Sequence, residues 1–194
     1  MEKKFFENRE EPKQEVIFDK TKGTLLLEVD KNKLGVEALR DEAIARNLNE
    51  KNTFHLTVIG SDTAEKIVKS LAGHSGDEIA AVLFKIEDLA RKVKWNVDLK
   101  PEFYYVTKEY NDASSEDPEQ LIKEMRESII QIADANGIAE FYDELKNLTG
   151  LEFELPMPHV TLFTNSTRPD KKLRGIGIYS REEFQEMNPI KIEV

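Results

Sequence analysis

The sequence predicts a protein of mixed helices and strands, of the α+β or α/β class. Segments rich in β-branched residues are interspersed along the chain with segments of helical periodicity. Each half of the chain also contains one strand-like segment with a histidine two residues before a threonine, which suggests an internal two-fold repeat. No linker or low-complexity tract divides the 194 residues, so we expect one domain over 1–194, with residues 1–20 as a peripheral extension.

The first half of the chain alternates between the two periodicities. Its predicted elements are a strand over 22–30, a helix over 35–48, a strand over 53–60, helices over 62–72 and 75–93, and strands over 94–99 and 102–110. The helix over 62–72 begins with Asp62 and Glu65, and the helix over 75–93 with Ser75 and Glu78. Both pairs have the spacing of a capping box, which marks a helix N-terminus.

The second half of the chain begins with a polar loop over 111–117. Its predicted elements are helices over 117–136 and 139–148, and strands over 151–155, 158–164, 175–180 and 189–194. Asp117 can cap the first helix, with Pro118 at its first position and Gly137 just past its end. The predicted buried stripe of this helix is Leu121, Met125, Ile129 and Ile132.

Composition predicts a soluble, cytoplasmic and monomeric protein. The chain has no cysteine, which excludes disulfides, thiolate metal sites and a cysteine nucleophile. Its longest apolar run, 79–84, is too short to cross a bilayer, and its first residues lack the apolar core of a signal peptide. The net charge of −10 argues against binding to long duplex nucleic acid, but is compatible with a small nucleotide or an RNA end in a locally basic cleft.

Two of the three histidines share one sequence frame, His55-Leu56-Thr57 and His159-Val160-Thr161. Side chains alternate faces along a strand, so each histidine lies on the same face as its threonine. If the two strands are close in space, two imidazoles and two hydroxyls converge on one cleft. The chance of this coincidence is on the order of one in a hundred, although satisfied core or edge histidines on two similar strands remain the alternative interpretation.

Such a set of groups suits the cleavage of a phosphodiester. One histidine can activate water or a ribose hydroxyl, and the other can protonate the departing oxygen. The threonine hydroxyls can donate hydrogen bonds to the non-bridging oxygens, where negative charge accumulates. This chemistry requires no metal and no cofactor.

The two motifs resemble those of the 2H phosphoesterase superfamily, which is named after a pair of HxTx or HxSx motifs. They stand 104 positions apart, and a proline precedes the second histidine, as is familiar in the family. The resemblance implies a bilobal α+β fold with two pseudo-symmetric lobes around a central groove. It also implies action on 2′,3′-cyclic phosphates or 2′-5′ linkages, as in RNA 2′,3′-cyclic phosphodiesterases, also called 2′-5′ RNA ligases. By this resemblance His55 and His159 are catalytic, and Thr57 and Thr161 bind the substrate phosphate.

Other candidate residues carry weaker signals. The most basic run of this acidic chain follows the second motif, and it can either steer a phosphate or form an ordinary solvated loop. Its cations are Arg168, Lys171, Lys172 and Arg174. His74 lies between two predicted helices, where an exposed loop histidine is expected. The aromatic residues Trp95, Phe103, Tyr104 and Tyr105 are expected in the core or in cross-strand pairs, although one of the three on the strand can stack on a base.

Two other functions are compatible with the same residues. The same cleft can serve a binding module that senses a nucleotide without converting it, or a 2′-5′ RNA ligase. The paired histidines argue against a pure binder, which has no need of two proton-transfer groups.

Overall fold

The computed structural model describes residues 14–113 and 121–194. These residues form a mixed α+β structure in which all strand pairings are antiparallel. The strands are β1 (Val16–Asp19), β2 (Thr24–Glu28), β3 (Asn49–Glu50), β4 (His55–Ile59), β5 (Asn96–Ala113), β6 (Leu121–Asn136), β7 (His159–Ser166) and β8 (Ile190–Ile192). The α-helices are α1 (Arg40–Ala45), α2 (Ser61–Ser70), α3 (Gly76–Lys92), α4 (Ile138–Thr149) and α5 (Arg181–Glu186). Short 3-10 turns cover Lys31–Lys33, Glu37–Leu39 and Pro169–Lys171.

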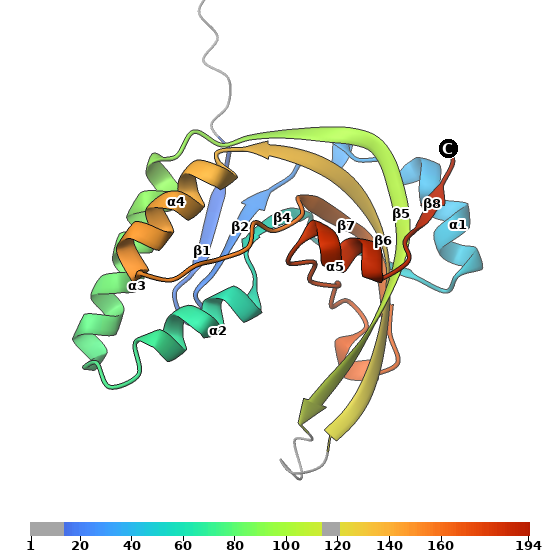
Figure 1. Ribbon diagram of the computed structural model, residues 1–194. Coiled ribbons are helices and arrows are strands. Elements are labelled where there is room, and N and C mark those ends of the chain that lie inside the picture. The colour runs from blue at the N-terminus through green and yellow to red at the C-terminus, as the bar shows by residue number, and fades with distance from the viewer. Residues whose placement is uncertain (1–13, 114–120) are drawn as a thin grey trace, which may run out of the picture.

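The strands form one eight-stranded sheet in the order β1-β2-β4-β7-β6-β5-β8, and β3 also pairs with β7. Figure 1 shows β5 and β6 as long curved strands that run side by side. Helices α2, α3 and α4 lie at one end of this curved sheet and α1 at the other, while α5 lies inside the curve. The first-half strand β4 and the second-half strand β7 are neighbours at the centre of the sheet.

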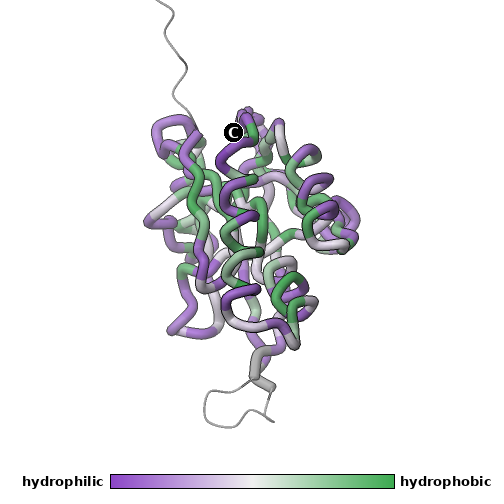
Figure 2. Tube along the Cα trace, turned by 90° about the vertical axis from the view of Figure 1, so that its left-hand side faces the viewer, coloured by the Kyte–Doolittle hydropathy of each residue, from purple (hydrophilic) through white to green (hydrophobic). Residues whose placement is uncertain are grey.

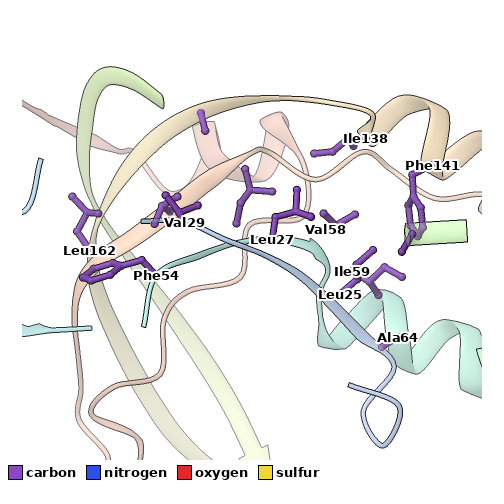
Figure 3. Packing of buried hydrophobic residues seen from close by; sticks show 14 of the residues in the cluster. Leu25, Leu27, Val29, Phe54, Val58, Ile59, Ala64, Ile138, Phe141 and Leu162 are labelled. Atoms are coloured by element: carbon purple, nitrogen blue, oxygen red, sulfur yellow. The ribbon is translucent and has the colours of Figure 1, made fainter. Parts of the chain in front are cut away.

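The main hydrophobic core lies between the sheet and its helices. Figure 2 shows hydrophilic and hydrophobic residues alternating along the helices, as expected for helices with one polar and one apolar face. In Figure 3 the labelled side chains from the strands β2 and β4 lie close to those from α2 and α4. The helix predicted over 35–48 is a 3-10 turn followed by the short α1, and this segment buries a stripe of apolar side chains. This stripe consists of Val36, Leu39, Ala43 and Leu48.

The predicted helix over 117–136 is wrong, because residues 121–136 form the strand β6. Both faces of this strand are covered: Ile129 belongs to the main core and Ile130 to a second apolar cluster on the opposite face. β-branched residues suit such a strand, and pairing with both β5 and β7 outweighs the helical spacing of the apolar residues. Met125, in the predicted buried stripe, is 38% exposed. Asp117 and Pro118 lie outside the described residues.

Gly137 marks a helix start rather than a helix end. It precedes α4 with a φ of 97°, a left-handed conformation that favours glycine. A Cβ at this position would also lie 2.6 Å from the side chain of Val93. The helix predicted over 139–148 is confirmed as α4. The glycine that ends a helix in this region is Gly150, at the C-terminus of α4, with a φ of 70°.

Other boundaries also differ from the prediction. The strands expected over 94–99 and 102–110 are one strand, β5, whose register shifts between Leu99 and Phe103 around Pro101. Proline has no N–H to donate to the neighbouring strand, so the pairing with β6 is irregular here, but the strand continues past this point. Residues 151–155 and 175–180, predicted as strands, form no regular secondary structure and pair with no strand of the described sheet. Residues 16–19, expected within a peripheral extension, form the edge strand β1.

The two predicted capping boxes have different outcomes. Ser75 and Glu78 form the predicted reciprocal pair at the start of α3. In contrast, α2 begins one residue earlier than predicted, at Ser61, and its N-cap is Gly60, which provides no side-chain cap. Asp62 therefore lies in the first turn of α2 instead of capping it.

Candidate active site

The structure brings the two His-x-Thr segments together at the centre of the sheet. Leu56 of β4 pairs with Val160 of β7, so the middle residues of the two motifs are opposite each other. In an antiparallel pair with this register, His55 lies across from Thr161 and Thr57 across from His159, all on one face. Side chains opposite each other in such a pair have Cβ atoms about 4.5–5.5 Å apart. The histidines therefore occupy one diagonal of a four-residue square, and the threonines occupy the other.

The four side chains line one cleft of about 900 Å³. Its floor is the sheet. Its walls include the start of α2 and two segments without regular secondary structure: residues 152–156, and residues 174–179, which we call the strap. On the opposite face of the sheet, Leu56 and Val160 are completely buried in the main core. Burial of a side chain of this size contributes about 1.5–3 kcal/mol, so packing on the opposite face holds both strands, and with them the four side chains, in place.

His159 is the more buried of the two histidines, with 8% of its surface exposed. Its Nδ1 lies 2.8 Å from the carbonyl oxygen of Met157. Burial lowers the pKa of His159, whereas the carbonyls of Met157 and Ile176 and the charge of Glu183 act in the opposite direction, because they favour the imidazolium.

His55 lies in an environment that favours the neutral ring. Burial lowers the pKa of His55 to about 4, and the ammonium of Lys51 and the ring of His159 add to this effect. Lys51 directly follows β3, and its ammonium donates a hydrogen bond to the carbonyl of Leu173. Burial lowers the pKa of Lys51 as well.

The strap is held against the sheet by side chains from β5 and β6. Arg126 donates from Nη1 to the carbonyl of Gly175 at 3.4 Å, and its guanidinium stacks 3.9 Å from the centre of the Tyr110 ring. The Tyr110 hydroxyl accepts a hydrogen bond from the N–H of Gly177 at 3.2 Å. Arg126 is also paired through two hydrogen bonds with the fully buried Glu124, and it holds the pKa of that carboxyl down at about 2.

Gly175 allows the strap to approach Thr161 of β7 closely. A Cβ at this position would lie 3.0 Å from Oγ1 of Thr161, so a larger residue would displace the hydroxyl or the strap. At the far end of the strap, the Tyr179 hydroxyl shares a hydrogen bond with the hydroxyl of Ser61 at 3.3 Å. The strap thus connects the second motif to the start of α2, which follows the first motif.

The four cations of the basic run have different positions. Arg174, at the start of the strap, lines the cleft. Arg168 forms an ion pair with Asp170 at 2.9 Å, and Lys171 lies 3.6 Å from a carboxylate oxygen of Glu124. Lys172 is exposed and, like Arg168 and Lys171, does not belong to the cleft lining.

The other candidates lie away from the cleft. His74 is exposed, and its Nδ1 is 3.1 Å from the carbonyl of Leu71. Trp95 packs against Phe141 in the core. The three consecutive aromatic residues of β5 are also absent from the cleft lining; they are Phe103, Tyr104 and Tyr105.

Sequence reasoning missed several residues of the cleft, above all Lys51, Tyr110 and Arg126. Lys51 precedes His55 by four positions. The residues between them belong to no strand, so strand periodicity does not predict that the two side chains lie close together. Tyr110 lies on β5 and Arg126 on β6, where side chains alternate between the two faces of the sheet. A correct prediction of β6 as a strand was needed to expect the Arg126 side chain on the cleft face.

The described residues contain no group of three histidine, aspartate or glutamate side chains placed to hold a metal ion. Within the same residues, no helix is long and apolar enough to cross a membrane. Comparison of the chain with protein-family models, with curated proteins and with solved structures finds no match.

Proposed function

We propose that the protein is a phosphodiesterase that cleaves a 2′,3′-cyclic or 2′-5′ nucleotide phosphoester by acid–base catalysis with His55 and His159. The observation that carries this proposal is the square of two imidazoles and two hydroxyls on one face of adjacent strands, inside a cleft. The resemblance of the two motifs to those of the 2H phosphoesterases supports the same proposal.

The environments of the two histidines support an assignment of their roles. Enzymes commonly separate an acid from a base by giving them different surroundings. The ammonium of Lys51 disfavours a proton on His55, which suits a general base that activates water. Carbonyl oxygens around His159 favour its imidazolium, which suits a general acid that protonates the leaving ribose oxygen. The hydroxyls of Thr57 and Thr161 would donate to the non-bridging oxygens of the phosphate between the rings.

The first experiment is hydrolysis of 2′,3′-cyclic nucleotides in the presence of a chelator by the wild type, His55→Ala and His159→Ala. We expect turnover in the wild type and its loss in both variants, while His74→Ala, which removes an exposed imidazole, retains activity. Activity that is abolished by EDTA and restored by zinc would contradict this mechanism.

A second substrate separates the acid from the base. In a nucleoside p-nitrophenyl phosphate the leaving group departs without protonation, so general-acid catalysis contributes little. We therefore expect His159→Ala to retain a large share of activity on this ester and His55→Ala to lose it. The reverse pattern would exchange the two roles.

One observation favours a second candidate, a nucleotide-binding module. Burial lowers the pKa of both rings, so in the free protein neither imidazole carries its proton readily at neutral pH. The negative phosphate of a bound substrate would raise both pKa values, which reconciles this observation with catalysis. A calorimetric titration in which 2′,3′-cyclic AMP binds tightly and is recovered unchanged would favour the binding module.

A further inference from the structure

Three cations of the cleft lining, Lys51, Lys66 and Arg174, have no carboxylate within ion-pair distance among the described residues, and Lys66 donates to the carbonyl of Glu152 at 2.7 Å. In an acidic chain of net charge −10, most lysines and arginines of the described residues form ion pairs. Over residues 14–113 and 121–194, neither Lys51 nor Arg174 has a carboxylate within ion-pair distance. Lys51 donates to the carbonyl of Leu173, which carries no charge. Its partial burial lowers its pKa, because no carboxylate offsets the loss of solvation. An uncompensated charge on the half-buried Lys51 is costly unless an anion occupies the cleft, and Arg174 offers a second, exposed charge to the same anion.

The ammonium of Lys51 and the start of the strap, which carries Arg174, meet on the His55 side of the square. Lys51 donates to the carbonyl of Leu173, which is the residue directly before Arg174. The carbonyl of Arg174 accepts a hydrogen bond from Thr164 of β7 at 3.0 Å, and the next residue, Gly175, packs against Thr161. Thr161 in turn lies across from His55.

The opposite end of the cleft is different in charge. Its lining contains Lys22 and Lys66, but also Asp62, Glu152 and Glu154. Two cations there face three carboxylates, and the ammonium of Lys22 lies 3.6 Å from a further one, on Asp19. This end also carries the half-buried ring of Phe153, which suits the base or the ribose of a nucleotide better than an anion.

Carboxylates near the basic end do not neutralise it. Glu28 pairs with His55 across the sheet, but it is exposed and lies outside the cleft lining. Glu124 is engaged by Arg126 through two hydrogen bonds. At this end of the cleft, beside the square, the charges of Lys51 and Arg174 therefore remain without a carboxylate partner among the described residues.

We propose that Lys51 and Arg174 form a second anion subsite, so that the ligand of this cleft carries a phosphate in addition to the one held between the histidines. This inference rests on the proposed function for the position of the first phosphate. The ligand class is a nucleotide or short oligonucleotide with a second phosphate on the His55 side, and a mononucleoside with a single phosphate leaves the subsite empty.

The test compares the binding of adenosine 2′-monophosphate with that of adenosine 2′,5′-bisphosphate to the full-length protein by calorimetry in a chelator. Hydrogen bonds to charged groups are individually strong, so we expect the bisphosphate to bind at least roughly 10-fold more tightly to the wild type. We expect Arg174→Gln to reduce this ratio, and Lys51→Met combined with Arg174→Gln to bring it to about 1.

Lys172→Gln is the matched control, because it removes one exposed charge from the same loop outside the cleft. It should preserve the wild-type ratio. Because Arg174 is exposed, its variant tests the subsite even if replacement of the half-buried Lys51 impairs folding. Equal affinities in the wild type, a ratio that survives the double substitution, or absence of binding by both nucleotides would overturn the inference.

The binding ratio and turnover are separate readouts. A bisphosphate preference without any hydrolysis of cyclic nucleotides would refute the proposed catalysis and leave the subsite in a binding protein. Hydrolysis without a bisphosphate preference would refute the subsite alone.

Discussion

Protonation of His55 should make the stability of this protein depend on pH. The pKa of this ring is about 4 in the folded protein against an ordinary 6.5, mainly because the ring is buried. At about 1.4 kcal/mol per pH unit, the complete effect is about 3 kcal/mol. Above pH 6.5 the ring is neutral in both states and costs nothing. As the pH falls from 6.5 towards 4, the unfolded chain binds a proton that the folded protein does not, so stability is lost.

Urea denaturation followed by Trp95 fluorescence measures this loss. Between about pH 7.5 and about pH 5.5, we expect the wild type to lose about 1 kcal/mol more than His55→Gln, which has no titrating ring at this position. The lower pH stays above the isoelectric point of about 5.0, where solubility is poorest. His74→Gln controls for the removal of an imidazole, since His74 is exposed.

A direct titration of the His55 ring by NMR decides the cause. The burial argument requires its pKa to lie well below 6.5 in the folded protein. A measured value of 6.5 or higher, or equal pH dependence in the wild type and His55→Gln, would refute the reasoning.

Three other predictions follow from single contacts. Gly175→Ala places a Cβ 3.0 Å from Oγ1 of Thr161, so we expect turnover of cyclic nucleotides to fall roughly 10-fold with a far smaller change in melting temperature; unchanged kinetics would show that the strap yields freely. Lys51→Met removes the ammonium that disfavours the imidazolium of His55, so NMR should show a higher pKa for this ring, and an unchanged value would leave burial as the only cause. Ser75→Ala breaks the capping box of α3 and should cost about 1 kcal/mol in urea denaturation without affecting nucleotide binding, because the cap lies outside the cleft lining.

Much of the fold was predictable where local signals and tertiary contacts agree. The capping box at Ser75, the strands around the two motifs and the buried stripe over 36–48 are examples, because short-range spacing alone determines which side chains face the core. The prediction was wrong for residues 121–136, where the apolar residues fit a helical stripe and a strand equally well. The two faces of this strand bury different clusters, and no local spacing reports that.

The candidate site divides in the same way. The sequence by itself determined that His55 shares a face with Thr57 and His159 with Thr161, because strand periodicity is a local property of the backbone. Only the tertiary structure decided that β4 and β7 are neighbours, with the motifs in register. The same long-range packing buries both rings and thereby lowers their pKa values. It also brings Lys51 and Arg174, far apart in the chain, to one side of the cleft, because strand order and loop closure depend on contacts between distant residues.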